Sequence, residues 1–301
     1  MAVLPNRFLI KLDAANDYFK TYQPHLGVLR LTVGKAVGLN GTKKSGVKRL
    51  LDKVARDVPD CYAKVKVGAE AEWRTSTKKN SREPTWDETH DYLVMDHDQC
   101  IYVDVKDADL GGDDDMGLAA TAITQILMAE GGTQELALVH DGQPLDARLT
   151  LHAKFYDFVP DASSFKAEEN QGEGRICGLA TVLVAAVRGI QGTREQLKPS
   201  VKVTWGAKEF RTGIMSYSPG VDIFNPSFDV AFRMPITAEM LKAPANFKLA
   251  LWNAEAESGS VEVPFAEVLG AEGMLLEKAW DVVSGTTIRA SITLRGTQLR
   301  A

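Results

Sequence analysis

The sequence is poor in cysteine and has no long apolar run. Its 301 residues contain only three cysteines, Cys61, Cys100 and Cys177. An odd number at wide spacing does not suit a disulfide framework, so we expect reduced thiols and a cytoplasmic location. The longest apolar run, 179–187, is far shorter than the roughly 20 residues of a membrane-spanning helix. Arg7 and Lys11 interrupt any secretory signal. We therefore expect contact with a membrane to be peripheral.

The sequence also has no excess of positive charge and no catalytic motif. The formal net charge is -5, whereas nucleic-acid-binding proteins are usually basic, so nucleic acid is not an expected partner. The sequence has no phosphate-binding loop, dinucleotide fingerprint or nucleophile elbow. His97 and Cys100 lack the second pair that a zinc site requires. These absences give no support for an enzyme.

Short stretches rich in β-branched residues dominate what is present. They alternate partly between apolar and polar residues, which is typical of half-buried strands. The stretches cover 28–33, 62–67, 101–105 and 147–155 in the first half, and 180–187, 201–205, 248–252 and 287–294 in the second. Closely spaced strands separated by polar turns predict an all-β, antiparallel β-sandwich architecture.

Three segments depart from the strand pattern. Residues 42–56 carry apolar residues at helical spacing among several lysines, so we expect one basic amphipathic helix inserted in a loop. That helix could lie on a membrane surface or pack on the edge of a sandwich. Residues 236–241 indicate a second short helix, and the polar, glycine-containing stretch 159–176 is typical of a linker.

Three blocks of the first half recur in the second half in the same order. Residues 60–68 align with 198–206, 83–86 with 225–228, and 105–109 with 251–255. A repeat of this kind indicates two copies of one domain. We therefore expect a lead-in at 1–24, a first domain at 25–158, a linker at 159–176 and a second domain at 177–301.

The repeated blocks resemble a C2 domain. Its motifs are matched in the first copy by residues 59–65, 83–88 and 107–117. Residues 4–8 and 27–31 are similar to the stretch that enters the C2 pair of extended synaptotagmins and tricalbins. The extra helix in the first loop also resembles that group.

The resemblance implies a fold and a function. The fold would be two antiparallel eight-stranded β-sandwiches, with the helix of 42–56 inserted in the first loop of the first domain. The function would be that of a calcium-responsive, non-enzymatic module that binds phospholipid for membrane tethering, lipid transport or membrane trafficking. In the resembled proteins a lipid-transfer domain and a membrane anchor precede the C2 pair. This sequence lacks both, so we expect a fragment of a membrane-anchored protein or a relative that lost those parts.

Acidic residues near the first and third loops of the first copy are candidate calcium ligands. The resemblance assigns this role to Asp60, Asp107, Asp109 and Asp114, with assistance from Asp113. Carboxylates suit calcium, a hard cation that takes about six to eight oxygen ligands, although a solvated acidic turn is the alternative for 113–115. One first-loop aspartate of the family pattern is missing, and Asp52 or Asp57 could substitute for it. We therefore expect a weak or single-ion site, because affinity follows the charge of the ligands.

The second copy departs from the acidic pattern. Lys198 takes the place of Asp60, and Asn253 and Glu255 take the places of the aspartate pair. Its third loop, 257–260, contains no aspartate. We expect no calcium in the second domain. Its role would be packing, contact with protein partners or constitutive contact with lipid.

A basic strand face of the first copy is a candidate site for lipid headgroups. Alternate residues of one strand share a face, and the next strand adds further cations; the candidates are Tyr62, Lys64, Lys66, Arg74 and Lys78. In similar domains of protein kinase C such a face binds phosphoinositides, and each cation near an anionic membrane contributes on the order of 1 kcal/mol. The alternative is an ordinary solvated strand face. The competing function is a calcium-independent scaffold for protein interactions.

Overall fold

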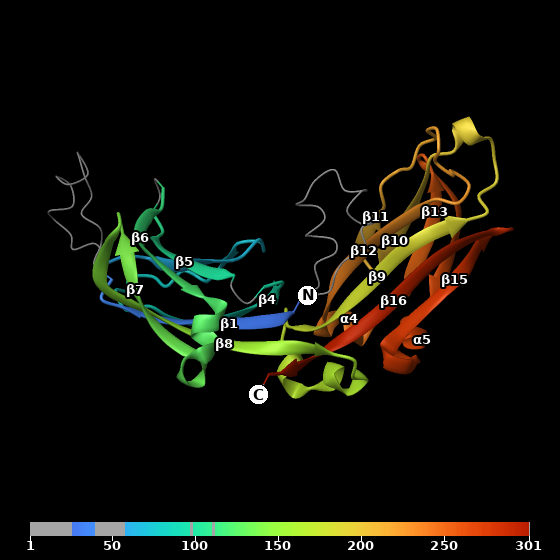
Figure 1. Cartoon of the computed structure of the whole chain (residues 1–301). Helices are drawn as coiled ribbons and strands as arrows, with labels where there is room; N and C mark the ends of the chain where they lie inside the picture. Colours follow the sequence, from blue (N-terminus) through green and yellow to red (C-terminus); the bar gives the residue numbers. More distant parts are fainter. Residues whose placement is uncertain (1–25, 40–57, 97–98, 110–111, 301) are drawn as a thin grey trace. The chain divides into compact units, whose positions relative to one another are not determined.

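The computed structural model describes residues 26–39, 58–96, 99–109 and 112–300 (Figure 1). These residues divide into two compact units, a first domain over 26–157 and a second domain over 158–298. Three features expected from the sequence lie outside the described residues: the loop helix of 42–56, the substitute ligands Asp52 and Asp57, and the segment 4–8.

The first domain consists of two four-stranded antiparallel sheets. One sheet has the order β4-β1-β8-β7, formed by Thr85–Val94, Gly27–Val37, Gln143–Val159 and Thr133–His140. The other has the order β3-β2-β5-β6, formed by Trp73–Arg74, Cys61–Val67, Cys100–Asp107 and Asp114–Ala122. The pair Leu118–Val139 joins the two sheets where β6 meets β7. Between these strands the chain forms α3 (Ile123–Met128) and η2 (Glu130–Gly132).

Buried apolar and exposed polar side chains alternate along the strands, and the buried ones form the core of this domain. In β2 the side chains of Ala63, Val65 and Val67 are buried, whereas Lys64 is partly exposed and Lys66 is exposed. Burying an aliphatic side chain of this kind stabilises a fold by roughly 1.5–3 kcal/mol. The apolar residues therefore fix which face of β2 turns inward, and the lysines are presented on the outer face of the sheet.

The second domain repeats this arrangement. One sheet has the order β12-β9-β16-β15, formed by Ser227–Thr237, Ile176–Arg188, Thr286–Leu299 and Leu275–Val283. The other has the order β11-β10-β13-β14, formed by Lys208–Arg211, Pro199–Trp205, Phe247–Asn253 and Ala256–Val263. The predicted pair of antiparallel eight-stranded β-sandwiches is thus confirmed.

Equivalent hydrogen bonds recur in the two domains. The backbone N–H of Ala63 donates to Thr75 Oγ1 at 2.9 Å, and that of Val201 donates to Thr212 Oγ1 at 2.9 Å. Both threonines follow the short strand that pairs with the strand of the aligned block. The repeat seen in the sequence therefore extends to individual side chains.

Short helices lie in the connections of the second domain. They are α4 (Ala238–Lys242), α5 (Phe265–Gly270), η5 (Arg194–Gln196) and η6 (Glu272–Met274). The short helix expected at 236–241 begins two residues late, because β12 continues to Thr237, which still pairs with Ile176 of β9.

Part of the stretch expected to be a linker packs on the second domain. It forms η3 (Ala162–Lys166) and η4 (Glu168–Asn170). Phe165 is only 5% exposed and joins the apolar core of this domain. The side-chain amide of Asn170 is fully buried and donates to Thr297 Oγ1 at 2.9 Å and to the Ser164 carbonyl at 3.2 Å. These contacts hold 162–170 in place as an ordered part of the second domain.

Candidate functional site

The candidate ligands Asp60, Asp107 and Asp114 lie at one end of the β3-β2-β5-β6 sheet. Asp60 precedes β2, Asp107 ends β5 and Asp114 begins β6, and Asp107 pairs with both Cys61 and Asp114 in the sheet. Asp107 is largely buried and accepts a hydrogen bond from the backbone N–H of Asp60 at 2.8 Å. The Asp60 carboxylate in turn accepts from the N–H of Asn80 at 2.8 Å. Two of the carboxylates thus also organise the backbone of this end of the domain.

Asp113 is turned toward a different group. Its carboxylate accepts a hydrogen bond from the Tyr62 hydroxyl, and the Arg74 guanidinium stacks over the Tyr62 ring with its Cζ atom 3.5 Å from the ring centroid. The pKa of Asp113 is lowered by the Tyr62 hydroxyl and further by the positive charges of Arg74 and Lys64. Burial and the Asp113 hydrogen bond raise the pKa of Tyr62 to about 12. Asp113 therefore interacts with the basic face of the sheet.

The donor chemistry at this end suits calcium, but an assembled cage is not present in the described part of the chain. Carboxylate oxygens are the ligands that calcium prefers. Among the described residues, no three His, Cys, Asp or Glu side chains are grouped as a metal site would require.

Four of the five expected headgroup residues share the outer face of the sheet. Within the sheet, Lys64 pairs with Arg74 of β3 and with Asp104 of β5, and Tyr62 pairs with Lys106. Since partners in adjacent strands point to the same side, this face carries Tyr62, Lys64, Lys66, Arg74 and, in addition, Lys106. Lys78 lies elsewhere: its ammonium is 3.7 Å from Glu88 of β4, which belongs to the other sheet.

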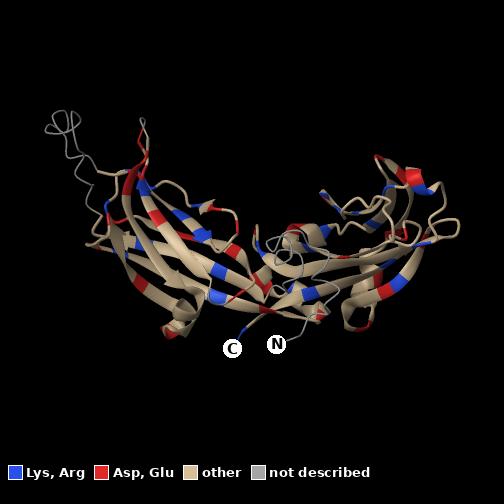
Figure 2. Ribbon diagram, turned by 45° about the horizontal axis from the view of Figure 1, so that its top comes forward, with Lys and Arg blue, Asp and Glu red and all other residues tan. Residues whose placement is uncertain are grey.

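Carboxylates accompany most of the cations on this face. Lys64 lies 3.4 Å from Glu72, and Lys106 lies 2.9 Å from Asp104 and also contacts Asp115. The hydrogen bond to Asp115 and then the contact with Asp104 raise the pKa of Lys106 above its usual value. Figure 2 shows basic and acidic residues close together on this domain. The face is therefore nearly neutral as a whole, although it is rich in cations.

The sequence reasoning missed Lys106 and its acidic partners. The signal was present, because 102, 104 and 106 alternate along β5 just as Tyr62, Lys64 and Lys66 alternate along β2. What the spacing alone could not provide is the register between the two strands, which places Lys106 beside Tyr62.

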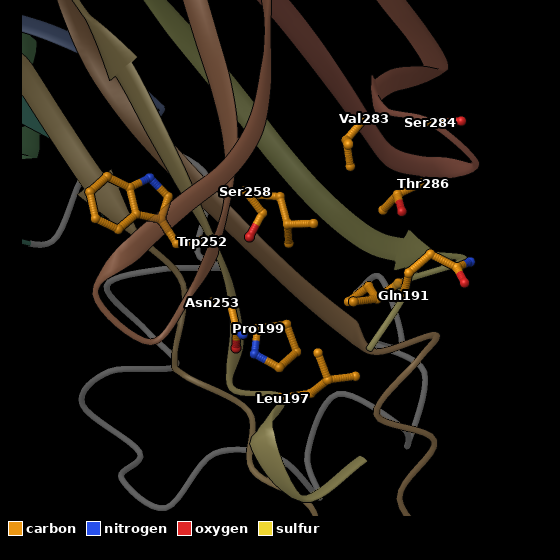
Figure 3. Close-up of a pocket in the computed structure, with 11 residues that line it drawn as sticks. Gln191, Leu197, Pro199, Trp252, Asn253, Ser258, Val283, Ser284 and Thr286 are labelled. Carbon is orange, nitrogen blue, oxygen red and sulfur yellow. The ribbon is translucent and has the colours of Figure 1, made fainter. Parts of the chain in front are cut away.

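The corresponding end of the second domain has no aspartate in the position of Asp107. Asn253 accepts a hydrogen bond from the backbone N–H of Lys198 at 2.6 Å, which reproduces the contact between Asp107 and Asp60 without the charge. A pocket of about 180 Å³ opens beside it (Figure 3). Its lining includes Ile190, Leu197, Pro199 and Val283, and none of the lining residues is ionisable. The pocket at this end of the second domain is therefore uncharged and largely apolar.

The outer sheet face of the second domain carries a similar group of cations. The Lys202 ammonium lies 4.2 Å from the centroid of the Trp252 ring, and the Arg211 guanidinium lies 5.3 Å from it. Both cations also have acidic neighbours, because Lys202 is 2.9 Å from Glu209 and Arg211 is 3.6 Å from Glu255.

Comparisons with known proteins agree with this geometry. Residues 27–138 match the family model of the C2 domain. The chain is similar to the calcium-bound C2A and C2B domains of extended synaptotagmin 2, with a TM-score of 0.71 and 20% identity over 93% of this chain and 100% of that one. A structure of the SMP, C2A and C2B domains of extended synaptotagmin 2 gives a TM-score of 0.67 and 20% identity over 92% of this chain and 58% of that one. No curated protein sequence matches significantly.

The first domain matches the C2 family model over residues 27–138 and has the fold of a C2 domain. Taken over both domains, the chain has the fold of a tandem C2 pair, as in extended synaptotagmin 2, and the predicted resemblance is confirmed at the level of the fold. No helix within the described residues is long and apolar enough to cross a membrane.

Proposed function

We propose that the chain is a non-enzymatic module that binds anionic phospholipid membranes through its first domain. The observation that carries this proposal is the outer face of β3, β2 and β5, where Tyr62, Lys64, Lys66, Arg74 and Lys106 come together on a C2 fold. Each cation that approaches an anionic surface contributes on the order of 1 kcal/mol, and a headgroup phosphate would replace the carboxylates that now accompany these cations. Phosphoinositide headgroups suit the site best, because they offer several phosphate charges to a compact group of cations.

Calcium is the proposed regulator of this binding. Asp60, Asp107, Asp109 and Asp114 would hold the ion, with Asp113 as a further ligand, and the ion would supply positive charge at the loop end of the domain. Binding is expected to be weak, because a first-loop carboxylate is missing from the family pattern. The second domain is not expected to bind calcium, since Lys198 and Asn253 occupy the equivalent positions.

Asp113 links the two expected sites of the first domain. It belongs to the candidate calcium ligands, yet it bonds to Tyr62 and neutralises Arg74 on the basic face. A headgroup phosphate has to compete with this carboxylate for the same cations. If calcium and a headgroup phosphate both favour the release of Asp113 from Tyr62, each of them must strengthen the binding of the other by thermodynamic linkage.

Flotation with liposomes tests the proposal. Vesicles that contain anionic lipid and phosphoinositide are mixed with the chain in calcium or in chelator. Binding that requires calcium supports the calcium response, and binding in both conditions assigns the function to the basic face alone. In either case the Lys64→Gln, Lys66→Gln double variant should bind several-fold more weakly, whereas Lys78→Gln serves as a matched control off the face. Absence of binding in both conditions refutes the membrane proposal.

The uncharged pocket at the loop end of the second domain favours a second candidate function, a calcium-independent scaffold for protein interactions. An apolar pocket without ionisable lining suits a protein contact that does not respond to calcium. Flotation separates the candidates, because a scaffold would show no lipid binding. Under the membrane proposal the chain acts as a cytoplasmic peripheral protein in tethering, lipid transport or membrane trafficking.

A further inference from the structure

The helices α4 and α5 belong to the second domain (Figure 1), and residues of both line another pocket. Its volume is about 360 Å³, and it lies between these two helices and the segment that begins with η3. A volume of this size falls within the range of roughly 300–1,000 Å³ that is typical of small-molecule sites. None of its lining residues belongs to the first domain or to the candidate membrane-binding face.

The floor of the pocket is apolar and preformed. Phe165 and Phe265 are each no more than 5% exposed, and the partly buried Leu241 and Leu269 complete the apolar lining. The wall formed by η3 is fixed from behind, because the buried Asn170 bonds to Thr297 and to the Ser164 carbonyl. An apolar ligand would therefore meet a cavity that needs little ordering before it binds.

Among the residues that the structure describes, two lysines are the only ionisable groups that line this pocket. Lys166 ends η3 and Lys242 ends α4, and no acidic residue is part of the lining. No salt bridge joins either ammonium to a residue in the described part of the chain. Glu239 of α4 acts on Lys242 electrostatically but accepts a hydrogen bond from the backbone N–H of Gly174 at 3.3 Å. The rim is thus positive over an apolar floor.

We propose that this pocket binds a single-chain anionic amphiphile of the fatty-acid class. The hydrocarbon chain would lie on Phe165, Phe265, Leu241 and Leu269, and the carboxylate would lie between Lys166 and Lys242. The positive rim excludes a cationic ligand, and the limited volume excludes a two-chain phospholipid as a whole. This assignment goes beyond the proposed function and does not depend on it, since it concerns a different domain and a different ligand.

Calorimetry with decanoate and decanol tests the proposal without any membrane. Both probes are used as monomers with the full chain; they share the hydrocarbon chain and differ in charge. Decanoate is expected to bind more tightly than decanol. The Lys166→Gln, Lys242→Gln double variant should bind decanoate about tenfold more weakly, given two cations near one anion, while its affinity for decanol stays the same. Lys248→Gln, on β13 and outside the pocket, is the matched control.

A pocket-filling variant locates the binding. Ala266 is an exposed residue of α5 that lines the pocket, so Ala266→Trp should preserve the fold and remove binding of both probes. Circular dichroism and thermal unfolding verify that the variants are folded. Undiminished decanoate binding by folded Ala266→Trp, equal affinity for both probes, or an equal loss of both in the lysine variant would each overturn the proposal.

Discussion

Replacing Asp113 with asparagine is expected to strengthen binding of the chain to phosphoinositide vesicles in the absence of calcium. The substitution keeps the size of the side chain and removes its charge. In the structure the Asp113 carboxylate accepts a hydrogen bond from the Tyr62 hydroxyl and interacts electrostatically with Arg74 and Lys64. The neutral amide leaves the same cations available to a headgroup phosphate.

The magnitude follows from the charges on the face. Its four cations, Lys64, Lys66, Arg74 and Lys106, are accompanied by four carboxylates, Glu72, Asp104, Asp113 and Asp115. The group therefore has a formal charge of zero (4 minus 4), and Asp113→Asn raises it to +1. One net positive charge at an anionic membrane corresponds to about a fivefold increase in partitioning. The increase should shrink as salt is added, because the charges are exposed and become screened.

Partitioning onto vesicles of graded phosphoinositide content, in chelator, measures this effect. Asp141→Asn is the matched control, since Asp141 lies in the turn between β7 and β8 with a side chain that is 91% exposed, and its substitution changes the net charge equally. Tyr62→Phe offers an independent test, because it removes the donor to Asp113 and keeps the ring beneath Arg74. If Asp113→Asn binds no better than Asp141→Asn, Asp113 does not compete with the headgroup, and the coupling between the two sites is refuted.

Three further changes probe the calcium ligands and the stability of the first domain. Asp109→Asn should abolish calcium binding in lipid-free calorimetry; unchanged binding would remove Asp109 from the ligand set. Asp91→Ala should destabilise the domain by about 3–5 kcal/mol in urea unfolding, because it removes the carboxylate that balances the buried Arg30 charge at 2.9 Å; a loss below about 1 kcal/mol, typical of exposed pairs, would contradict this reasoning. Burial, with Asp107 and Asp60 nearby, raises the pKa of Cys61 from 9.0 to about 12. As the pH rises, the Cys61 thiol therefore loses its proton at a lower pH in the unfolded chain than in the folded chain. The free energy of unfolding should therefore fall between pH 9 and 12. If it falls as steeply in the Cys61→Ala variant, Cys61 is not the cause.

The sequence allowed the fold to be predicted because its pattern is redundant. Buried Ala63, Val65 and Val67 alternate with lysines, the aligned block of the second half alternates in the same way, and both copies give eight strands in two sheets. The alternation within a strand and the repeat between the two halves both indicate the same architecture, and a sequence specifies a fold when such signals agree.

The candidate site was predictable only in part, because spacing does not determine where side chains in loops point. Asp107 and Asp114 are held together by the pairing of β5 and β6, as their positions at strand ends suggested. Asp113, one residue earlier, bonds to Tyr62 instead. Lys78 was grouped with the basic face by its distance along the chain, but it pairs with Glu88 of the other sheet. These outcomes depend on strand register and on rotamers, which a single sequence does not provide.

The hydrogen bond that Asn253 accepts from the N–H of Lys198 reproduces the backbone contact of Asp107 without the calcium ligation that we propose for Asp107. An amide oxygen secures the backbone between the two strands as a carboxylate does, but it carries no charge for an ion. The exchange of aspartate for asparagine at this position therefore removes one proposed calcium ligand from the second copy and keeps the backbone contact. Under the proposed function, membrane binding by the first domain would vary with calcium, whereas binding by the second domain would not.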